Sequence, residues 1–175
     1  MEAVRGLGAK LIAVTGATYV KERHMHPLLI LLPIFLFADL ERFGFVNETF
    51  GRRLSCFRIS ADGTLGGRET VAEFGPATYP DGLTFDAQRG IWITSIVSNR
   101  IIRISPDGLQ HVVLEDSDPE HVATAEKAFR RGTMDRRHLD NIKSRRLRNV
   151  SSLAFGGSDL KTVYLGCLLG DSLAT

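Results

Sequence analysis

The sequence contains two copies of one phrase, SCFRISADG at residues 55–63 and RIIRISPDG at residues 100–108. Each copy is a strand-like run that ends in a Ser-x-Asp-Gly turn. The Asp-Gly pair suits a tight turn because glycine adopts positive φ at little cost. The copies begin 45 residues apart, and a period of about 40–45 residues is typical of β-propellers, in which each repeat is one small sheet, or blade.

Shorter phrases complete the repeat. GLTFD at residues 82–86 corresponds to SLAFG at residues 152–156, and a second strand follows each of them. Together with the longer phrase, they indicate units near residues 35–71 and 80–114 and a third that begins at residue 150. The sequence therefore predicts an all-β fold, a partial β-propeller of about three blades with a helical insertion.

The repeat divides the chain into segments. Residues 1–35 carry no repeat signal, and residues 36–175 form the predicted, incomplete propeller domain. Within it, residues 116–149 are predicted to be a helical, basic insertion between blades. A helix is expected to begin near Pro119, since proline is favoured at the first helical position, and to end at Gly132.

The insertion concentrates positive charge. Residues 127–148 hold nine of the 22 lysines and arginines, and Trp92 and most other aromatic residues lie elsewhere. Because Asp135 and Asp140 interrupt the basic run, we interpret it as a solvated face and not as a nucleic-acid surface. The formal net charge of +2 also argues against a nucleic-acid partner. Trp92 itself is expected to pack between blades.

Two features bear on the compartment. Cys56 and Cys167 are far apart in the sequence and make no disulfide framework, which favours a reducing, cytoplasmic location. The apolar segment at residues 27–38 is shorter than the roughly 20 residues of a membrane span, so no membrane association is predicted. We expect a buried strand or hairpin there; the alternative is the core of a secretion signal.

The phrase Tyr79-Pro80-Asp81-Gly82-Leu83 contains the best candidate for a functional residue, Asp81. A carboxylate at the end of a blade's first strand can enter the central channel and contribute to a site for a cation such as Ca²⁺, which prefers oxygen ligands. The alternative is a Pro-Asp-Gly turn with a solvated aspartate. Both interpretations are compatible with the sequence pattern.

Three stretches resemble the family of gluconolactonase, regucalcin (senescence marker protein) and luciferin-regenerating enzyme. They are FVNETFGRRL with ISADGTL (45–54 and 59–65), PDGLTFD with GIWIT (80–86 and 90–94), and VSSLAFGG with VYLG (150–157 and 163–166). They occur in the family's order, and the resemblance covers about residues 37–171.

The resemblance implies a six-bladed propeller with one divalent metal ion, Ca²⁺, Zn²⁺ or Mn²⁺, in the channel. It implies hydrolysis of lactones or related esters, with a small lactone or sugar acid as substrate. Asp81 matches the family's aspartate, which is both a metal ligand and the catalytic acid/base. Pro33 stands where the family usually has an asparagine ligand, and the first-blade glutamate has no match in residues 1–35, so we expect the site to be incomplete.

Other candidate ligands are weaker. Glu48 follows a strand of the preceding unit and is a candidate for lining the channel; the alternative is a surface glutamate. His24 and His26 share one face of a strand if they form one, but the sequence offers no third zinc ligand near them.

Three functional interpretations stay open. The chain is a gluconolactonase-like hydrolase, a non-catalytic propeller fragment that serves as a binding or interaction scaffold, or an incomplete gene product. Three blades leave sheet edges open, and open edges pair readily with other chains. We therefore expect self-association through blade edges.

Overall fold

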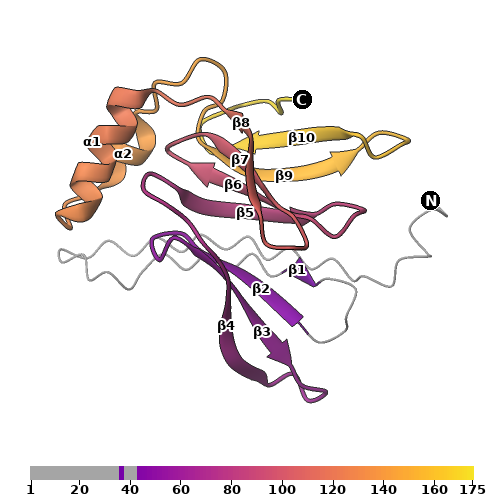
Figure 1. Ribbon diagram of the computed structural model, residues 1–175. Coiled ribbons are helices and arrows are strands. Elements are labelled where there is room, and N and C mark those ends of the chain that lie inside the picture. Colours follow the sequence, from indigo (N-terminus) through magenta and orange to yellow (C-terminus); the bar gives the residue numbers. More distant parts are fainter. Residues whose placement is uncertain (1–35, 38–42) are drawn as a thin grey trace.

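The computed structural model describes residues 36–37 and 43–175 (Figure 1). The expectations for residues 1–35, including those for His24, His26 and Pro33, lie outside this part. Of the apolar segment at 27–38, only the backbone of strand β1 (Leu36–Phe37) is described.

The first sheet is an antiparallel meander in which each strand pairs with the next along the chain. Its strands are β1, β2 (Phe43–Glu48), β3 (Arg53–Ile59) and β4 (Leu65–Glu73). The second sheet repeats this order with β5 (Tyr79–Phe85), β6 (Ile91–Ile96), β7 (Arg100–Ile104) and β8 (Gln110–Glu115).

The third sheet pairs β9 (Val150–Gly156) with β10 (Thr162–Cys167). A single bridge between Leu165 and Ala174 adds to its open side. Figure 1 shows the three sheets following one another along the chain, with the second between the first and the third. Four strands in up-and-down order are the content of one propeller blade.

The repeated phrase occupies the same place in both four-stranded sheets. It supplies the third strand, β3 or β7, and the turn that follows. The amide of Gly63 donates to the Ser60 carbonyl at 2.9 Å, and that of Gly108 donates to the Ser105 carbonyl at 2.8 Å. These glycines have φ values of 84° and 87°, which glycine adopts without strain. The predicted repeat and the all-β, blade-built fold class are confirmed.

The first strand of the second sheet connects the three sheets. β5 lies against β2 on one side and against β9 on the other. It is therefore the inner strand of its blade, the position from which propeller side chains reach the channel.

Two apolar layers hold the sheets together. Between the first and second sheets, Leu54 and Ile93 are fully buried, and the rings of Phe45 and Phe85 meet edge to face with centroids 5.3 Å apart. Burial of each such aliphatic side chain contributes about 1.5–3 kcal/mol. This layer joins residues far apart in the sequence, as a propeller core must.

The layer between the second and third sheets contains Trp92. Its ring meets that of Phe155 edge to face, with centroids 5.2 Å apart, and its indole N–H donates to Asp86 Oδ2 at 2.8 Å. The expectation that Trp92 packs between blades is confirmed. Cys56 and Cys167 are free thiols, as expected.

Two helices connect β8 to β9, α1 (Pro119–Arg130) and α2 (Arg136–Asp140). Pro119 opens α1 as predicted, and Asp118 caps it by accepting the His121 amide proton. Ala125 is fully buried and Phe129 packs beside it. Neither helix of the described part is long and apolar enough to cross a membrane.

Helix α1 lies at one end of the blades. Its apolar face packs against Phe50 of the β2–β3 turn, Tyr79 at the start of β5, and Val97 after β6. In an up-and-down sheet these three places share one end, and Asp81 is near the same end of β5. Figure 1 shows both helices together on that side.

Gly82 marks the closest approach of two blades. A Cβ atom placed on it would lie 2.8 Å from Ser152 Cα and would also clash with the Ser151 carbonyl oxygen, both in the backbone of β9. Backbone atoms cannot move aside as a flexible side chain can. The pairing of the second and third sheets therefore requires glycine here.

We predict that Gly82→Ala lowers the free energy of unfolding by about 1–3 kcal/mol, because the methyl group forces β5 and β9 apart. Urea unfolding followed by tryptophan fluorescence measures the change. Gly67→Ala in β4 is the matched control, since nothing lies within 4 Å of its added Cβ. Equal midpoints for the two variants would contradict the close approach.

Candidate functional site

Asp81 lies in a β-bulge of the inner strand β5. Pro80 pairs with Ser95 and Leu83 pairs with Ile93, so Asp81 and Gly82 together oppose the single residue Thr94. Two residues against one is the pattern of a bulge, which bends a strand and redirects its side chains. The Pro-Asp-Gly phrase is therefore strand and not a turn.

The bulge is held by side chains from two sheets. Thr94 Oγ1 in β6 accepts the Gly82 amide proton at 2.8 Å. Asn47 Nδ2 in β2 donates to the Asp81 carbonyl at 2.9 Å and to the Gly82 carbonyl at 3.2 Å. Asn47 and Thr94 are both fully buried. Side chains thus replace the ladder bonds that the bulge interrupts.

The Asp81 carboxylate is buried and accepts no hydrogen bond from the part of the chain that the structure describes. The residue is 7% exposed, and no donor among the described residues reaches the carboxylate. Burial raises the pKa of Asp81 to about 6. The alternative of a solvated aspartate is excluded by this burial.

The carboxylate of Asp86, five residues further along the chain, differs from that of Asp81 because it is fully hydrogen-bonded. It accepts hydrogen bonds from the Gly90 amide, the Trp92 indole and the Arg103 guanidinium. Burial opposes ionisation of Asp86, but these bonds prevail and lower its pKa. Asp86 stabilises the β5–β6 hairpin, whereas Asp81 stabilises nothing that the structure shows.

Glu48 is engaged within its own sheet. Its carboxylate binds Arg53 at 2.6 Å, Ser55 Oγ at 2.6 Å and Arg68 at 3.3 Å. The hydrogen bond from Arg53 outweighs the effect of burial and, with that from Ser55, lowers the pKa of Glu48 to about 2. No contact in the described part brings Glu48 to Asp81, so its role in lining the channel stays a prediction.

The donors for a metal ion are few in the described part. Residues 43–175 contain no group of three or more histidine, cysteine, aspartate and glutamate side chains placed to hold an ion. Ca²⁺ takes about 6–8 oxygen ligands. Asp81 does fit the role of one ligand, because an unpaired, buried carboxylate is what a cation would neutralise. Near its backbone, Asn47 Oδ1 is also buried without a hydrogen-bond partner in the described residues.

Sequence reasoning did not single out the asparagines that join the blades. Asn149 Oδ1 accepts the Val97 amide proton at 2.6 Å, and Asn99 Oδ1 accepts the Val150 amide proton at 2.9 Å. These reciprocal bonds link the β6–β7 turn to the start of β9. Both asparagines have positive φ, 68° and 44°, which this residue type tolerates. In the sequence, nothing distinguishes these two asparagines from ordinary turn residues.

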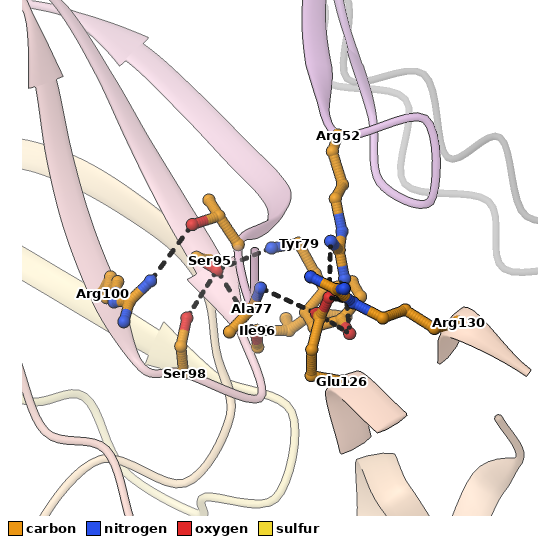
Figure 2. Close-up of polar contacts among 10 residues, drawn as sticks. Arg52, Ala77, Tyr79, Ser95, Ile96, Ser98, Arg100, Glu126 and Arg130 are labelled. Carbon is orange, nitrogen blue, oxygen red and sulfur yellow. Dashed lines mark hydrogen bonds and ion pairs between the residues drawn. The ribbon is translucent and has the colours of Figure 1, made fainter. Parts of the chain in front are cut away.

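A second unpredicted feature is the set of contacts at Glu126 of α1, shown in Figure 2. Arg52 of the β2–β3 turn binds both carboxylate oxygens, and the Ala77 amide donates at 2.9 Å. Arg130 adds a bond at 2.7 Å. One carboxylate therefore ties the insertion to the first blade and to the chain entering β5.

Aromatic rings surround this ion pair. The Arg52 guanidinium carbon lies 4.0 Å from the centroid of the Phe129 ring and 4.7 Å from that of Tyr79. Arg52 Nη2 also donates to the Tyr79 hydroxyl at 2.9 Å. Tyr79 is two residues before Asp81, so this cluster fixes the strand that carries the candidate residue.

The fold and this site define a class of protein built of propeller blades, with a buried carboxylate on an inner strand. Residues 35–125 match the family described as the SMP-30/Gluconolactonase/LRE-like region, and the chain belongs to this family. That assignment confirms the resemblance stated from the sequence.

Two named proteins are similar to this chain. A 6-deoxy-6-sulfogluconolactonase of Pseudomonas putida is 30% identical over 131 residues, which are 74% of this chain and 35% of that protein. A solved structure of a luciferin-regenerating enzyme is similar with a TM-score of 0.48 and 19% identity, over 75% of this chain and 36% of that one. The chain spans about a third of the length of the relatives it matches.

The contacts of Glu126 generate a stability prediction. We expect Glu126→Gln to lower the free energy of unfolding at pH 7 by about 2–4 kcal/mol, since it leaves Arg52 without its charge partner. Asp140→Asn, which removes the exposed Arg136–Asp140 pair of α2, is the control and should cost under about 1 kcal/mol.

The stabilisation by Glu126 depends on pH. The hydrogen bond from Arg52 outweighs burial and lowers the pKa of Glu126 to about 2. The stabilisation is therefore present above the unfolded-state pKa near 4.3 and is lost as pH falls toward 2. Thermal melts of the variant and of the unsubstituted chain should converge in that range; a constant gap would refute the assignment.

Asp81 should behave in the opposite way. Its pKa is raised on folding, so ionised Asp81 destabilises the fold above pH 6, and the penalty fades as pH falls toward 4. Asp81→Asn should therefore stabilise the chain at pH 7 by up to about 3 kcal/mol. At pH 4 the same substitution should change stability little. A variant that melts lower at pH 7 would show that the carboxylate is structurally satisfied.

Proposed function

We propose that this chain carries the catalytic aspartate of a lactonase-like hydrolase, and that Asp81 is this residue. The observation that supports it is the Asp81 carboxylate, which is buried on an inner strand and has no hydrogen-bond partner among residues 43–175. Perturbed ionisable groups of this kind cluster at functional sites. The family membership and the sulfogluconolactonase relative point to lactones as the substrate class.

The proposed chemistry is opening of a lactone ring by water. Water attacks the ring carbonyl carbon, the bond from that carbon to the ring oxygen breaks, and a hydroxy acid is released. One proton must leave the attacking water and one must reach the departing oxygen. A carboxyl group with a pKa near 6 suits both transfers at neutral pH, because it exchanges a proton readily in either direction.

A divalent ion, if bound, would polarise the lactone carbonyl and make water more acidic. Asp81 is the anionic ligand that the described part offers for it. We propose Ca²⁺, Zn²⁺ or Mn²⁺ as the ion. We also propose that this chain supplies only part of the ion's ligands. The substrate is proposed to be a small lactone or sugar-acid derivative.

A second candidate function is a non-catalytic binding scaffold. The observation in its favour is the apolar surface of β8 and its preceding turn, where Leu109, Val112 and Val113 are each more than half exposed. Self-association through sheet edges stays a prediction and belongs with this candidate. Light scattering of the purified chain measures it.

The test compares hydrolysis of gluconolactone-type substrates by the chain, with each ion added in turn, before and after Asp81→Asn. The substitution keeps size and removes acid–base capacity, so we expect a loss of about 100-fold or more. Asp62→Asn, in an exposed turn, is the control and should leave the rate unchanged. Activity that survives Asp81→Asn would reject the assigned role; no hydrolysis with any ion, together with association of the chain, would favour the scaffold.

A further inference from the structure

We propose that Asn47 is the positioning residue for Asp81, acting from the neighbouring blade through the backbone of the bulge. The proposal rests on the proposed function only in that Asp81 is taken as the reacting group. The hydrogen bonds of Asn47 go to backbone carbonyls and not to the carboxylate. Asn47 donates to the carbonyl groups of both bulge residues, Asp81 and Gly82.

The Asp81 carboxylate is held by packing and by its own backbone. No hydrogen bond or ion pair reaches it from the described residues. A carboxylate without polar partners takes its direction from the backbone that carries it. At a bulge this direction depends on local φ and ψ, since an extra residue redirects the side chains around it.

Asparagine is chemically suited to bind the two carbonyls of the bulge. Its NH₂ group supplies two donors, one for each carbonyl of the bulge, and the Thr94 hydroxyl adds only a long contact of 3.5 Å to the Gly82 carbonyl. Neither aspartate as a carboxylate nor leucine, which has a similar volume, can donate. Thr94 supplies the complementary acceptor for the Gly82 amide from the other side. The bulge is thus fixed by one side chain of each adjoining strand.

Burying Asn47 carries a cost in folding free energy. Its Oδ1 atom is buried without a partner in the described part, although the residue is fully buried. An unsatisfied buried acceptor typically costs about 1–3 kcal/mol. An apolar residue of similar volume would avoid this cost but would leave the two bulge carbonyls without the donors that Asn47 supplies.

The direct test measures the orientation of the Asp81 side chain by nuclear magnetic resonance. Three-bond couplings from Asp81 Cγ to its own backbone nitrogen and carbonyl carbon report χ1. We expect couplings of a single rotamer in the unsubstituted chain and averaged couplings in Asn47→Leu. A single, unchanged rotamer in Asn47→Leu would overturn the proposal, whether or not the chain hydrolyses lactones.

Asn149→Gly is the matched control. Asn149 is equally buried and also bonds to backbone groups of other elements, Val97 and Leu139. Glycine suits its positive φ. This variant should lose stability as Asn47→Leu does, yet keep one Asp81 rotamer. Averaging in both variants would mean that any loosening frees Asp81 and would overturn the specific role of Asn47.

A second readout is the affinity for Mn²⁺, followed by its paramagnetic effect on water relaxation. Residues that orient a metal ligand typically change affinity by about 10–100-fold. We expect a loss of about tenfold or more in Asn47→Leu and none in Asn149→Gly. If the unsubstituted chain binds no Mn²⁺ but the rotamer result holds, the metal-dependent function fails while the positioning role stands.

Asn47→Asp covers the case in which Asn47→Leu does not fold. It preserves size and shape, and its carboxyl group offers no donor when ionised and only one when protonated, so it cannot bond both carbonyls as the amide does. Averaged Asp81 couplings in this variant support the proposal. A single rotamer with the couplings of the unsubstituted chain overturns it.

Discussion

The close approach of β5 to its neighbours at Asp81 and Gly82 is the constraint on which the rest of the structure depends. At this point the backbone of the second blade touches β9 of the third, and Asn47 reaches it from the first. Only a residue without Cβ fits at position 82. One bulge therefore sets the spacing of three sheets and also carries the candidate catalytic carboxylate.

Two acidic residues, Glu126 and Asp81, differ in what their carboxylates do for the fold. Glu126 receives the charge of Arg52 and an amide of the β4–β5 connection, so its ionised form stabilises the fold. Asp81 receives no hydrogen bond or ion pair from the described residues, and burial raises its pKa, so its ionised form is expected to oppose folding. A carboxylate that the fold does not need electrostatically is available to a substrate or an ion. This difference supports the functional proposal alongside the family motif in which Asp81 lies.

Much of the fold could be predicted because its signals are local. The Ser-x-Asp-Gly turns depend on glycine at positive φ, and the start of α1 depends on a cap and a proline within three residues. Trp92 was expected between blades because a large ring in a half-buried strand has few other places. The contacts of Glu48 were not predicted, since its arginine partners lie on β3 and β4 and depend on strand register.

The sequence by itself determined the blade repeat and the helical insertion, and it singled out Asp81 as a candidate through its resemblance to a family motif. Only the tertiary structure showed that Pro-Asp-Gly is a bulge, that the carboxylate finds no partner within residues 43–175, and that Asn47 and Glu126 hold the strand that bears it. The physical reason is distance along the chain. Asn47 and Asp81 are separated by 34 residues and Arg52 and Glu126 by 74, and such pairs meet only when whole sheets pack.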